Sequence, residues 1–450
     1  MNENNLPNDF IDNEKVLLYD FIMGELIWKN RWSKEQIRAM LIEQSEFFWQ
    51  RDTGIEREKL LDVERASQLP HAVIISGLRR VGKSTLLAQM AHKLGKDTFY
   101  YINFEDDRFL GFQAQDANDL YQSLVEVFGE RKIFIIDEIQ NVEGWEHFVR
   151  RFMDWGFKFY ISGSNAALLS RELGTRLTGR HVPLELFPFS FREYLQFRGQ
   201  SGIKPNHLTT VEKAQLNASL DAYIQEGGIA DALKYSELSI LKTLYEDVLF
   251  RDIATRYRLE SVQALKELGF LLMSNPSGLV SFNKLKEHLR LGSVNTVSNY
   301  VENLENSWLL FTTRLYDFSV KRQQVAAKKV YGIDTGLVNA VGFHFSPNIG
   351  KLMENLVFLA LRRRTKEIFY YVTAGGYEVD FYLPEKRELI QVSQHLNNPA
   401  TREREVRALE DANKALDPKS LLILSNENED PIKIGKKEIL VRAIPEWLLD

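Results

Sequence analysis

The sequence predicts a mixed α/β protein whose core is a parallel sheet carrying a phosphate-binding loop. Between about residues 68 and 190, short apolar runs rich in β-branched and aromatic residues alternate with helical runs, a pattern typical of parallel sheets. Residues 77–84 read GLRRVGKS and fit the pattern G-x-x-x-x-G-K-[ST]. Residues 133–138 read IFIIDE, a buried strand that ends in two carboxylates. At 450 residues, the chain has room for two to four domains.

Composition excludes several classes of site. Hydrophobic residues make up 44% and charged residues 26%, which is ordinary for a globular protein. The net charge of -5 gives no overall attraction to nucleic acid, so DNA contact would need a local basic face. The absence of cysteine excludes disulfides and thiolate zinc sites. The N-terminus is polar and no apolar run approaches the ~20 residues of a membrane span, so we expect a cytoplasmic protein with no membrane partner.

The first half of the chain divides into three expected regions. Residues 1–66 predict an N-terminal helical region of two or three amphipathic helices. Residues 67–190 form the core, with strands expected at 72–75, 98–104, 132–136, 158–162 and 182–186. Residues 191–258 predict a helical lid, interrupted by Gly227 and Gly228.

Residues 259–327 predict a winged helix. Two helical runs at 281–289 and 294–304 flank a turn at Gly292, and a strand at 309–315 follows. Polar residues would lie exposed on the second helix, where they can contact bases or phosphates: Asn295, Thr296, Ser298 and Asn299. A structural or protein-docking module is the alternative. The positively charged segment 321–329 is interpreted as a linker.

Residues 328–450 predict a second α/β unit. A helix at 352–363 precedes strands at 368–373, 377–383 and 388–393, a charged helix at 401–416, and a strand at 421–424. The basic run Arg362-Arg363-Arg364 with Lys366 either binds a phosphate backbone or complements the dipole at the helix end.

The 77–84 motif predicts a nucleotide site. Its backbone N–H groups would surround a polyphosphate at a helix N-terminus, and its glycines permit close approach. Lys83 would reach the β- and γ-phosphates, and the Ser84 hydroxyl would hold Mg²⁺. Arg79 and Arg80 either touch phosphates or pack outward. The candidate nucleotide-binding residues are Gly77, Arg79, Arg80, Val81, Gly82, Lys83, Ser84 and Thr85.

The carboxylate pair predicts hydrolysis. Asp137 would anchor Mg²⁺ and Glu138 would polarise the attacking water, so we expect ATP and Mg²⁺ as cofactors. Asn165, or Ser164, would sense the γ-phosphate from the end of the strand at 158–162. Of the nearby arginines, Arg180 is the first candidate for an arginine finger and Arg176 the second, acting in cis or in a homo-oligomer.

Several motifs together resemble one family of AAA+/STAND-like P-loop ATPases of bacteria and archaea. They are GLRRVGKST, IFIIDEIQNVEGWE, YISGSN, LTGR and LELFPFSFREYL. The resemblance covers the chain from Ser67 to Asp450. It implies a winged helix after the ATPase core and then a C-terminal domain of unknown function similar to PD-(D/E)xK nucleases, with a restriction-endonuclease-like fold.

The resemblance also implies a degenerate nuclease site. Glu354 matches the acidic residue on the first helix of such nucleases, and Asp380 matches the aspartate on the strand. Gln391 and Ser393 stand where a glutamate and a lysine are expected. Glutamine is a poorer metal ligand than glutamate and serine carries no charge, so we expect nuclease activity to be lost or weak.

Taken together, these features predict Mg-dependent ATP binding and hydrolysis that drives conformational change in a DNA- or protein-associated module. The alternatives are a nucleotide-dependent regulatory binding protein with little turnover, and an ATP-gated DNA nuclease. DNA would bind through the winged helix or the C-terminal domain.

Overall fold

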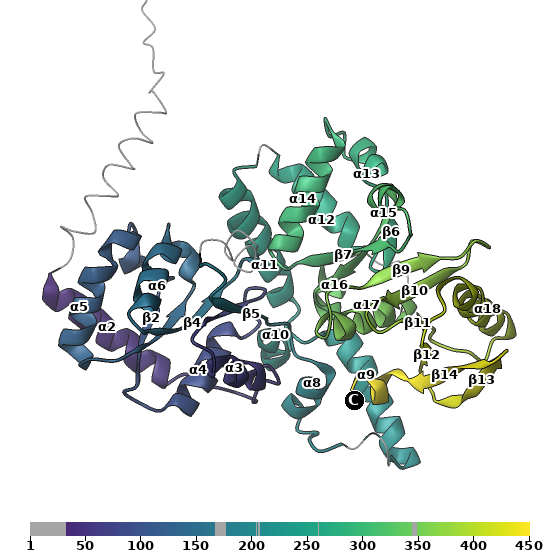
Figure 1. The fold of residues 1–450 in the computed structure, drawn as a ribbon, viewed down its shortest axis with the longest axis horizontal. Coiled ribbons are helices and arrows are strands. Elements are labelled where there is room, and N and C mark those ends of the chain that lie inside the picture. The colour runs from purple at the N-terminus through teal and green to yellow at the C-terminus, as the bar shows by residue number, and fades with distance from the viewer. Residues whose placement is uncertain (1–32, 167–176, 204, 206–207, 260, 344–348) are drawn as a thin grey trace, which may run out of the picture. The chain divides into compact units, whose positions relative to one another are not determined.

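The computed structural model describes residues 33–450 apart from 167–176, 204, 206–207, 260 and 344–348 (Figure 1). The chain divides into two compact units. Of the described residues, the first contains those in 33–75, 84–163 and 177–184, and the second contains those in 76–83, 164–166 and 185–450. Of the expected N-terminal helical region, the part before residue 33 lies outside the described residues.

The first unit is built on a five-stranded sheet. Its strand order is β2-β3-β4-β1-β5, formed by β1 (Ala72–Ser76), β2 (Phe99–Asn103), β3 (Ile133–Asp137), β4 (Lys158–Gly163) and β5 (His181–Glu185). β3 pairs in parallel with both β2 and β4. The helices of this part of the chain are α2 (Lys34–Trp49), α3 (Leu60–Ser67), α4 (Lys83–Leu94), α5 (Ala117–Phe128) and α6 (Trp145–Asp154). The predicted parallel sheet core is confirmed.

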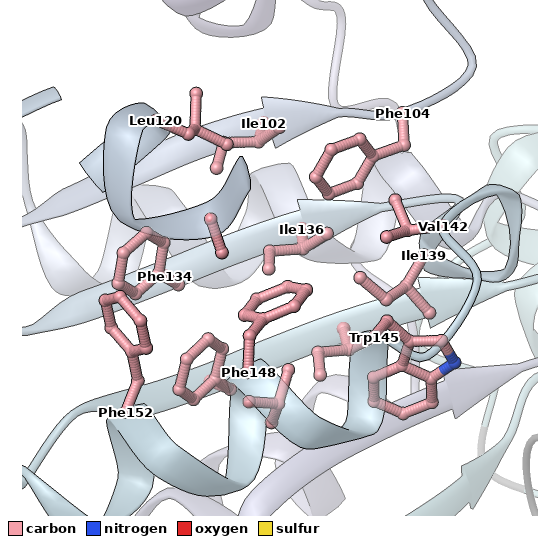
Figure 2. Close-up of a cluster of buried hydrophobic side chains, with 14 of the residues drawn as sticks. Ile102, Phe104, Leu120, Phe134, Ile136, Ile139, Val142, Trp145, Phe148 and Phe152 are labelled. Atoms are coloured by element: carbon pink, nitrogen blue, oxygen red, sulfur yellow. The ribbon is translucent and has the colours of Figure 1, made fainter. Parts of the chain in front are cut away.

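An aromatic-rich core fixes the central strand of this sheet (Figure 2). Phe134 and Ile136 of β3 are buried against Phe148 and Phe152, which project from one face of α6. Phe134 stacks on Phe159 of β4 with ring centroids 5.1 Å apart. Burying a side chain of this size contributes roughly 1.5–3 kcal/mol. This packing holds β3 in register and thereby positions the polar residues at its carboxyl end.

After β5, the second unit continues with helices, as expected for the lid at residues 191–258. They are α8 (Phe191–Phe197), α9 (Thr210–Glu226), α10 (Ala230–Tyr235) and α11 (Ser239–Asp247), followed by a π-helical segment, η6 (Val248–Thr255). The break at Gly227 has a steric cause. Gly227 has φ +76°, and a Cβ there would lie 2.1 Å from Oδ1 of Asp334. Asp334 caps α16 (Thr335–Val341) and accepts hydrogen bonds from the Gly228 and Leu337 N–H groups at 2.6 and 2.8 Å.

The next elements follow the order predicted for a winged helix. They are α12 (Val262–Met273), β6 (Gly278–Val280), α13 (Phe282–His288), α14 (Val294–Asn306), β7 (Leu310–Leu315), α15 (Val320–Val325) and β8 (Lys328–Gly332). β8 pairs antiparallel with both β7 and β6. The linker interpretation of 321–329 was wrong at its end, because Lys328 and Lys329 lie in β8 and Lys329 is buried. Positive charge alone does not distinguish a linker from a strand whose lysine is neutralised by distant residues.

β6, β7 and β8 belong to a nine-stranded sheet that continues past the domain boundary expected at residue 328. The strand order of this sheet is β13-β14-β12-β11-β10-β9-β7-β8-β6, and β7 pairs in parallel with β9. The added elements are α17 (Ile349–Arg362), β9 (Phe369–Val372), β10 (Glu378–Leu383), β11 (Glu388–Val392), α18 (Pro399–Leu416), β12 (Ser420–Ser425), β13 (Glu429–Ile434), β14 (Lys437–Ala443) and α19 (Ile444–Trp447). The sequence analysis missed β13, β14 and α19.

The basic run at the end of α17 is engaged inside the second unit. Arg362 binds Glu185 through both terminal nitrogens, at 2.5 and 3.1 Å, and Lys366 contacts the same carboxylate at 2.7 Å. Arg363 donates to the Pro188 carbonyl at 2.8 Å. This run therefore holds the segment after β5 in place, and the interpretation as a phosphate-backbone site is not supported.

Candidate functional site

The phosphate-binding loop runs from the end of β1 to the start of α4 and curls around its own lysine. Lys83 is buried, and its Nζ donates to the carbonyl oxygens of Gly77 and Leu78 at 3.2 Å each. Gly82 has φ +93°, and a Cβ on Gly77 would lie 2.2 Å from the Leu186 carbonyl oxygen. Both glycines are therefore required by the backbone, as the motif predicts. The loop presents one positive charge inside a ring of main-chain groups.

The loop residues 76–83 belong to the second unit, and other residues of that unit bind the start of the loop. The Ser76 hydroxyl donates to the Asn165 carbonyl oxygen at 2.8 Å and accepts from Trp308 Nε1 at 3.1 Å. Arg79 lies 3.7 Å from the carboxylate of Asp252 in η6. Sequence reasoning missed Trp308 and Asp252, since neither belongs to a recognisable motif. Asp252 lies in the π-helical segment η6, and such segments often occur at functional sites, but this feature is visible only in the structure.

At the end of β3, Ser162 organises both carboxylate residues. Its hydroxyl donates a short hydrogen bond to Oδ1 of Asp137 and accepts from the Glu138 N–H at 3.2 Å. Tyr101 lies with its hydroxyl 3.5 Å from Oδ2 of Asp137. Burial, and then the charge of Asp137, raise the pKa of Tyr101 well above its usual value, so the phenol stays a neutral donor. Asp137 is thus held by hydroxyl groups on both oxygens.

Glu138 has an unusual backbone conformation. Its φ of +54° lies in the left-handed region, which costs a non-glycine residue on the order of 1 kcal/mol. The side chain is held by a short hydrogen bond from the Gln140 amide to Oε2. Strain of this kind persists where the surrounding structure fixes it, which occurs often at active sites. Ser162 and Gln140 are functional candidates that sequence reasoning missed, although both lie in or beside the quoted motifs.

Sheet order brings the predicted residues to one edge. β2, β3 and β4 run in parallel, so the residues that follow their carboxyl ends, among them Glu138 after β3, share one edge of the sheet within the first unit. Ligands of open α/β sheets bind at this edge. The Ser84 hydroxyl and the Asp137 carboxylate are oxygen donors of the kind Mg²⁺ prefers, and Lys83 supplies charge for phosphates. These residues therefore fit a magnesium nucleotide.

The structure does not place every predicted residue at this edge. The Arg180 carbonyl accepts from the Ala72 N–H at the start of β1, the end away from the loop, and its side chain pairs with Asp154 at 2.7 Å. A finger role for Arg180 within its own chain is therefore wrong. Arg176 lies outside the described residues. Asn165 contacts Ser76 through its carbonyl, and Arg80 is exposed.

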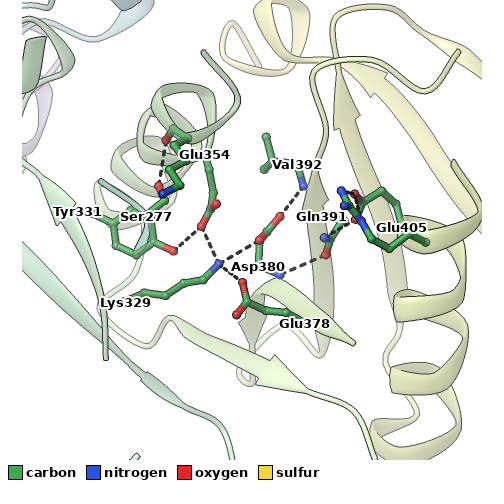
Figure 3. A network of polar contacts seen from close by, with 11 residues as sticks. Ser277, Lys329, Tyr331, Glu354, Glu378, Asp380, Gln391, Val392 and Glu405 are labelled. Atoms are coloured by element: carbon green, nitrogen blue, oxygen red, sulfur yellow. Dashed lines mark hydrogen bonds and ion pairs between the residues drawn. The ribbon is translucent and has the colours of Figure 1, made fainter. Parts of the chain in front are cut away.

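A second polar cluster contains three of the four residues expected in the degenerate nuclease site (Figure 3). Lys329 Nζ lies 2.8 Å from Glu354, 2.7 Å from Glu378 and 3.0 Å from Asp380. The Asp380 N–H donates to the Gln391 side chain at 3.1 Å. Ser393 is the exception: its hydroxyl lies 3.4 Å from the His395 carbonyl oxygen. Sequence reasoning missed Lys329 and Glu378.

Comparisons with known proteins give the family. Residues 70–195 match the family model of an AAA domain. An uncharacterized protein of Methanocaldococcus jannaschii is 36% identical over 390 residues, which covers 83% of this chain and 87% of that protein. The chain belongs to the AAA-type P-loop ATPases. A second uncharacterized protein, from Haemophilus influenzae, is 30% identical and covers 71% of this AAA-type chain and 81% of its own length.

Other matches add less. Residues 217–348 match a domain of unknown function. The solved structure of the Aeropyrum pernix Orc1 protein in complex with DNA aligns at a TM-score of 0.29 with 14% identity, covering 66% of this chain and 95% of that one. So low a score carries no argument about function. Among the described helices of this AAA-type chain, none is long and apolar enough to cross a membrane.

Proposed function

We propose that this chain binds ATP with Mg²⁺ and hydrolyses it with Glu138 as the base. The observation that carries the proposal is the arrangement at the end of β3. There Asp137 is fixed by Ser162 and Tyr101, and Glu138 is held next to it in a strained conformation. A phosphate-binding loop follows β1 in the same sheet. Two adjacent carboxylates, one for the metal and one for water, are what nucleotide hydrolysis requires.

Each residue of the site has a proposed role in this reaction. Lys83 exchanges its two loop carbonyls for β- and γ-phosphate oxygens, while loop N–H groups bind the same phosphates. Ser84 and Asp137 hold Mg²⁺, which when bound neutralises charge on the phosphates. Glu138 accepts a proton from the attacking water. Asn165 lies next to the loop and is proposed to sense the γ-phosphate.

Hydrolysis is tested by steady-state phosphate release from wild type and Glu138→Gln. Because a positioned general base contributes roughly 10²–10⁴-fold, we expect the variant to lose at least about 100-fold in rate and to retain nucleotide affinity. Omission of Mg²⁺ should abolish release from wild type. Equal, negligible rates in both proteins with tight nucleotide binding would instead establish the alternative, a regulatory binding protein with little turnover.

We propose that nucleotide state changes the helical and winged-helix parts through the contacts at the loop. Ser76 is bonded to Trp308, which joins α14 to β7, and Arg79 is paired with Asp252 in η6. Any shift of the loop on binding ATP must break or move these contacts. The output of the ATPase is therefore conformational change in the second unit.

We propose DNA as the partner of the winged-helix part. Asn295 and Asn299 are exposed on α14, and Lys321 and Arg322 are exposed on α15. Fluorescence anisotropy with duplex DNA tests this. Loss of binding in Asn295→Ala/Asn299→Ala, together with weakening as salt rises, is expected. If wild type shows no DNA binding with or without ATP, the partner is a protein.

A finger supplied by a second copy remains the proposed role of Arg176 or Arg180. In its own chain the Arg180 side chain makes a solvent-accessible ion pair with Asp154 and a hydrogen bond to Thr178. Mass measurement with and without an ATP analogue tests this: a nucleotide-dependent oligomer is expected, and a monomer in both states would rule out a finger in trans.

A further inference from the structure

The cluster around Lys329 joins two parts of the second unit (Figure 3). Lys329 projects from β8, whereas Glu354 lies on α17 and Asp380 on β10. The lysine side chain is 2% exposed, and its ammonium contacts three carboxylates within 3.0 Å. Tyr331, also on β8, donates to the same Glu354 oxygen that Lys329 contacts, at 2.9 Å.

A single cation lies among the three carboxylates of this cluster. The Lys329 ammonium has a carboxylate partner in each of three directions, at 2.8 Å (Glu354), 2.7 Å (Glu378) and 3.0 Å (Asp380), and these contacts favour its charged form. One cation therefore offsets carboxylates that would repel one another if it were removed.

The two departures from the nuclease pattern fit this arrangement. Gln391 accepts the Asp380 N–H at 3.1 Å through its oxygen and donates to Glu405 at 2.6 Å through its nitrogen. An ionised glutamate at position 391 would place a second carboxylate against Glu405 and would have no hydrogen to donate to it. The second Asp380 oxygen accepts the Val392 N–H at 2.9 Å. The Ser393 hydroxyl contacts the His395 carbonyl oxygen, so the cation of the cluster comes from Lys329 and not from position 393.

We propose that Lys329 is the permanent counter-cation of this cluster and stands where a nuclease-like site would hold a divalent metal ion. The second unit therefore binds no metal at Glu354 and Asp380 and cuts no DNA. Lys329 instead fastens β8 of the winged-helix part to α17 and β10, so these elements move together. This inference is independent of ATP hydrolysis. In the described part of the chain, no group of three acidic or histidine side chains has the geometry to hold a metal.

Manganese titration of the full-length chain without nucleotide tests the proposal. Thermal unfolding and calorimetry are followed in wild type, Asp380→Asn, Lys329→Met and Lys329→Met/Asp380→Asn. Wild type and Asp380→Asn should respond to MnCl₂ alike. Lys329→Met should gain a Mn²⁺-dependent rise in melting temperature that the double variant lacks, because a ligand stabilises the state that binds it.

Further variants keep the test decisive if Lys329→Met fails to fold. Lys329→Met/Glu378→Gln removes one carboxylate with the cation and leaves the pair that the nuclease pattern assigns to metal. Recovery of folding by MnCl₂ in either variant supports the proposal, and failure of both to gain Mn²⁺ binding overturns it. Lys329→Arg, which keeps the cation, should fold and bind no Mn²⁺. Asp380-dependent Mn²⁺ binding or DNA cleavage by wild type would also overturn it.

Discussion

Ser162 makes two contacts on which the carboxylate pair depends. It donates to Asp137 and accepts from the Glu138 N–H, and it is fully buried. Ser162→Ala leaves a buried carboxylate oxygen and a buried N–H short of a partner, which costs roughly 1–3 kcal/mol. We expect the turnover number to fall about tenfold or more while nucleotide affinity changes little.

The matched control for this substitution is Ser123→Ala on α5. Ser123 is half-buried and donates to the Asp119 carbonyl oxygen one turn earlier, so phosphate release should equal that of wild type. An unchanged rate in Ser162→Ala would show that Ser162 positions neither carboxylate during turnover.

Residues whose roles are set by local sequence were predictable, and those set by distant partners were not. Lys83 and Asp137 occupy positions that their motifs define within a few residues. Lys329 is neutralised by Glu354 and Asp380, which lie 25 and 51 residues away, and no pattern links them. The position of Arg180 beside the start of β1 was unpredictable for the same reason, because it follows from strand pairing.

At the scale of elements, Trp308 connects α14 and β7 to the start of the phosphate-binding loop. Its indole is buried and bonded to Ser76. Nucleotide binding should therefore change the intrinsic fluorescence of the chain, and Trp308→Phe should remove most of that change. The control is Trp155→Phe, because Trp155 is 54% exposed at the end of α6. A change that persists in Trp308→Phe would contradict the proposed connection.

The turn between α9 and α10 depends on a glycine. Gly227 combines positive φ with an Asp334 oxygen that would lie 2.1 Å from a new Cβ. We expect Gly227→Ala to lower the free energy of unfolding by more than about 1 kcal/mol. Gly350→Ala is the control, since Gly350 lies in α17 with open space around it and should be neutral or gain up to about 1 kcal/mol. Urea unfolding of both variants tests this expectation. Equal unfolding midpoints for Gly227→Ala and Gly350→Ala would refute the steric explanation.

For the whole molecule, the pKa of Asp334 makes the free energy of unfolding depend on pH. Burial raises its pKa from 3.8 to about 6 in the folded state, although backbone hydrogen bonds oppose the rise. The folded state therefore binds this proton more tightly than the unfolded state, and the free energy of unfolding falls as pH rises from about 4 to about 6, by at most about 3 kcal/mol.

The Asp334→Asn variant isolates this contribution. It is less stable than wild type at all pH values, because asparagine has one acceptor oxygen for the two N–H groups that Asp334 binds. Its unfolding free energy should fall less steeply than that of wild type between pH 4 and 6 in urea titrations. Parallel curves would contradict the raised pKa.

Much of the architecture followed from sequence because each strand and helix has its own periodic pattern. All five strands of the first sheet lie close to their expected ranges, and helices occupy much of residues 191–258, where a helical region was expected. The nine-stranded sheet did not follow, because β7 pairs with β9 across more than 50 residues and joins two parts that pattern analysis treats separately. β8 was missed because its buried lysine resembles a solvated charge.

Glu138 is proposed to activate water for ATP bound at residues 77–84. Single-turnover hydrolysis of pre-bound ATP isolates this step, since substrate binding then no longer limits the rate. We predict that Glu138→Gln binds ATP as wild type does and hydrolyses it at least about 100-fold more slowly, whereas Lys83→Ala fails to bind. Hydrolysis of bound ATP by Glu138→Gln at the wild-type rate would contradict the account.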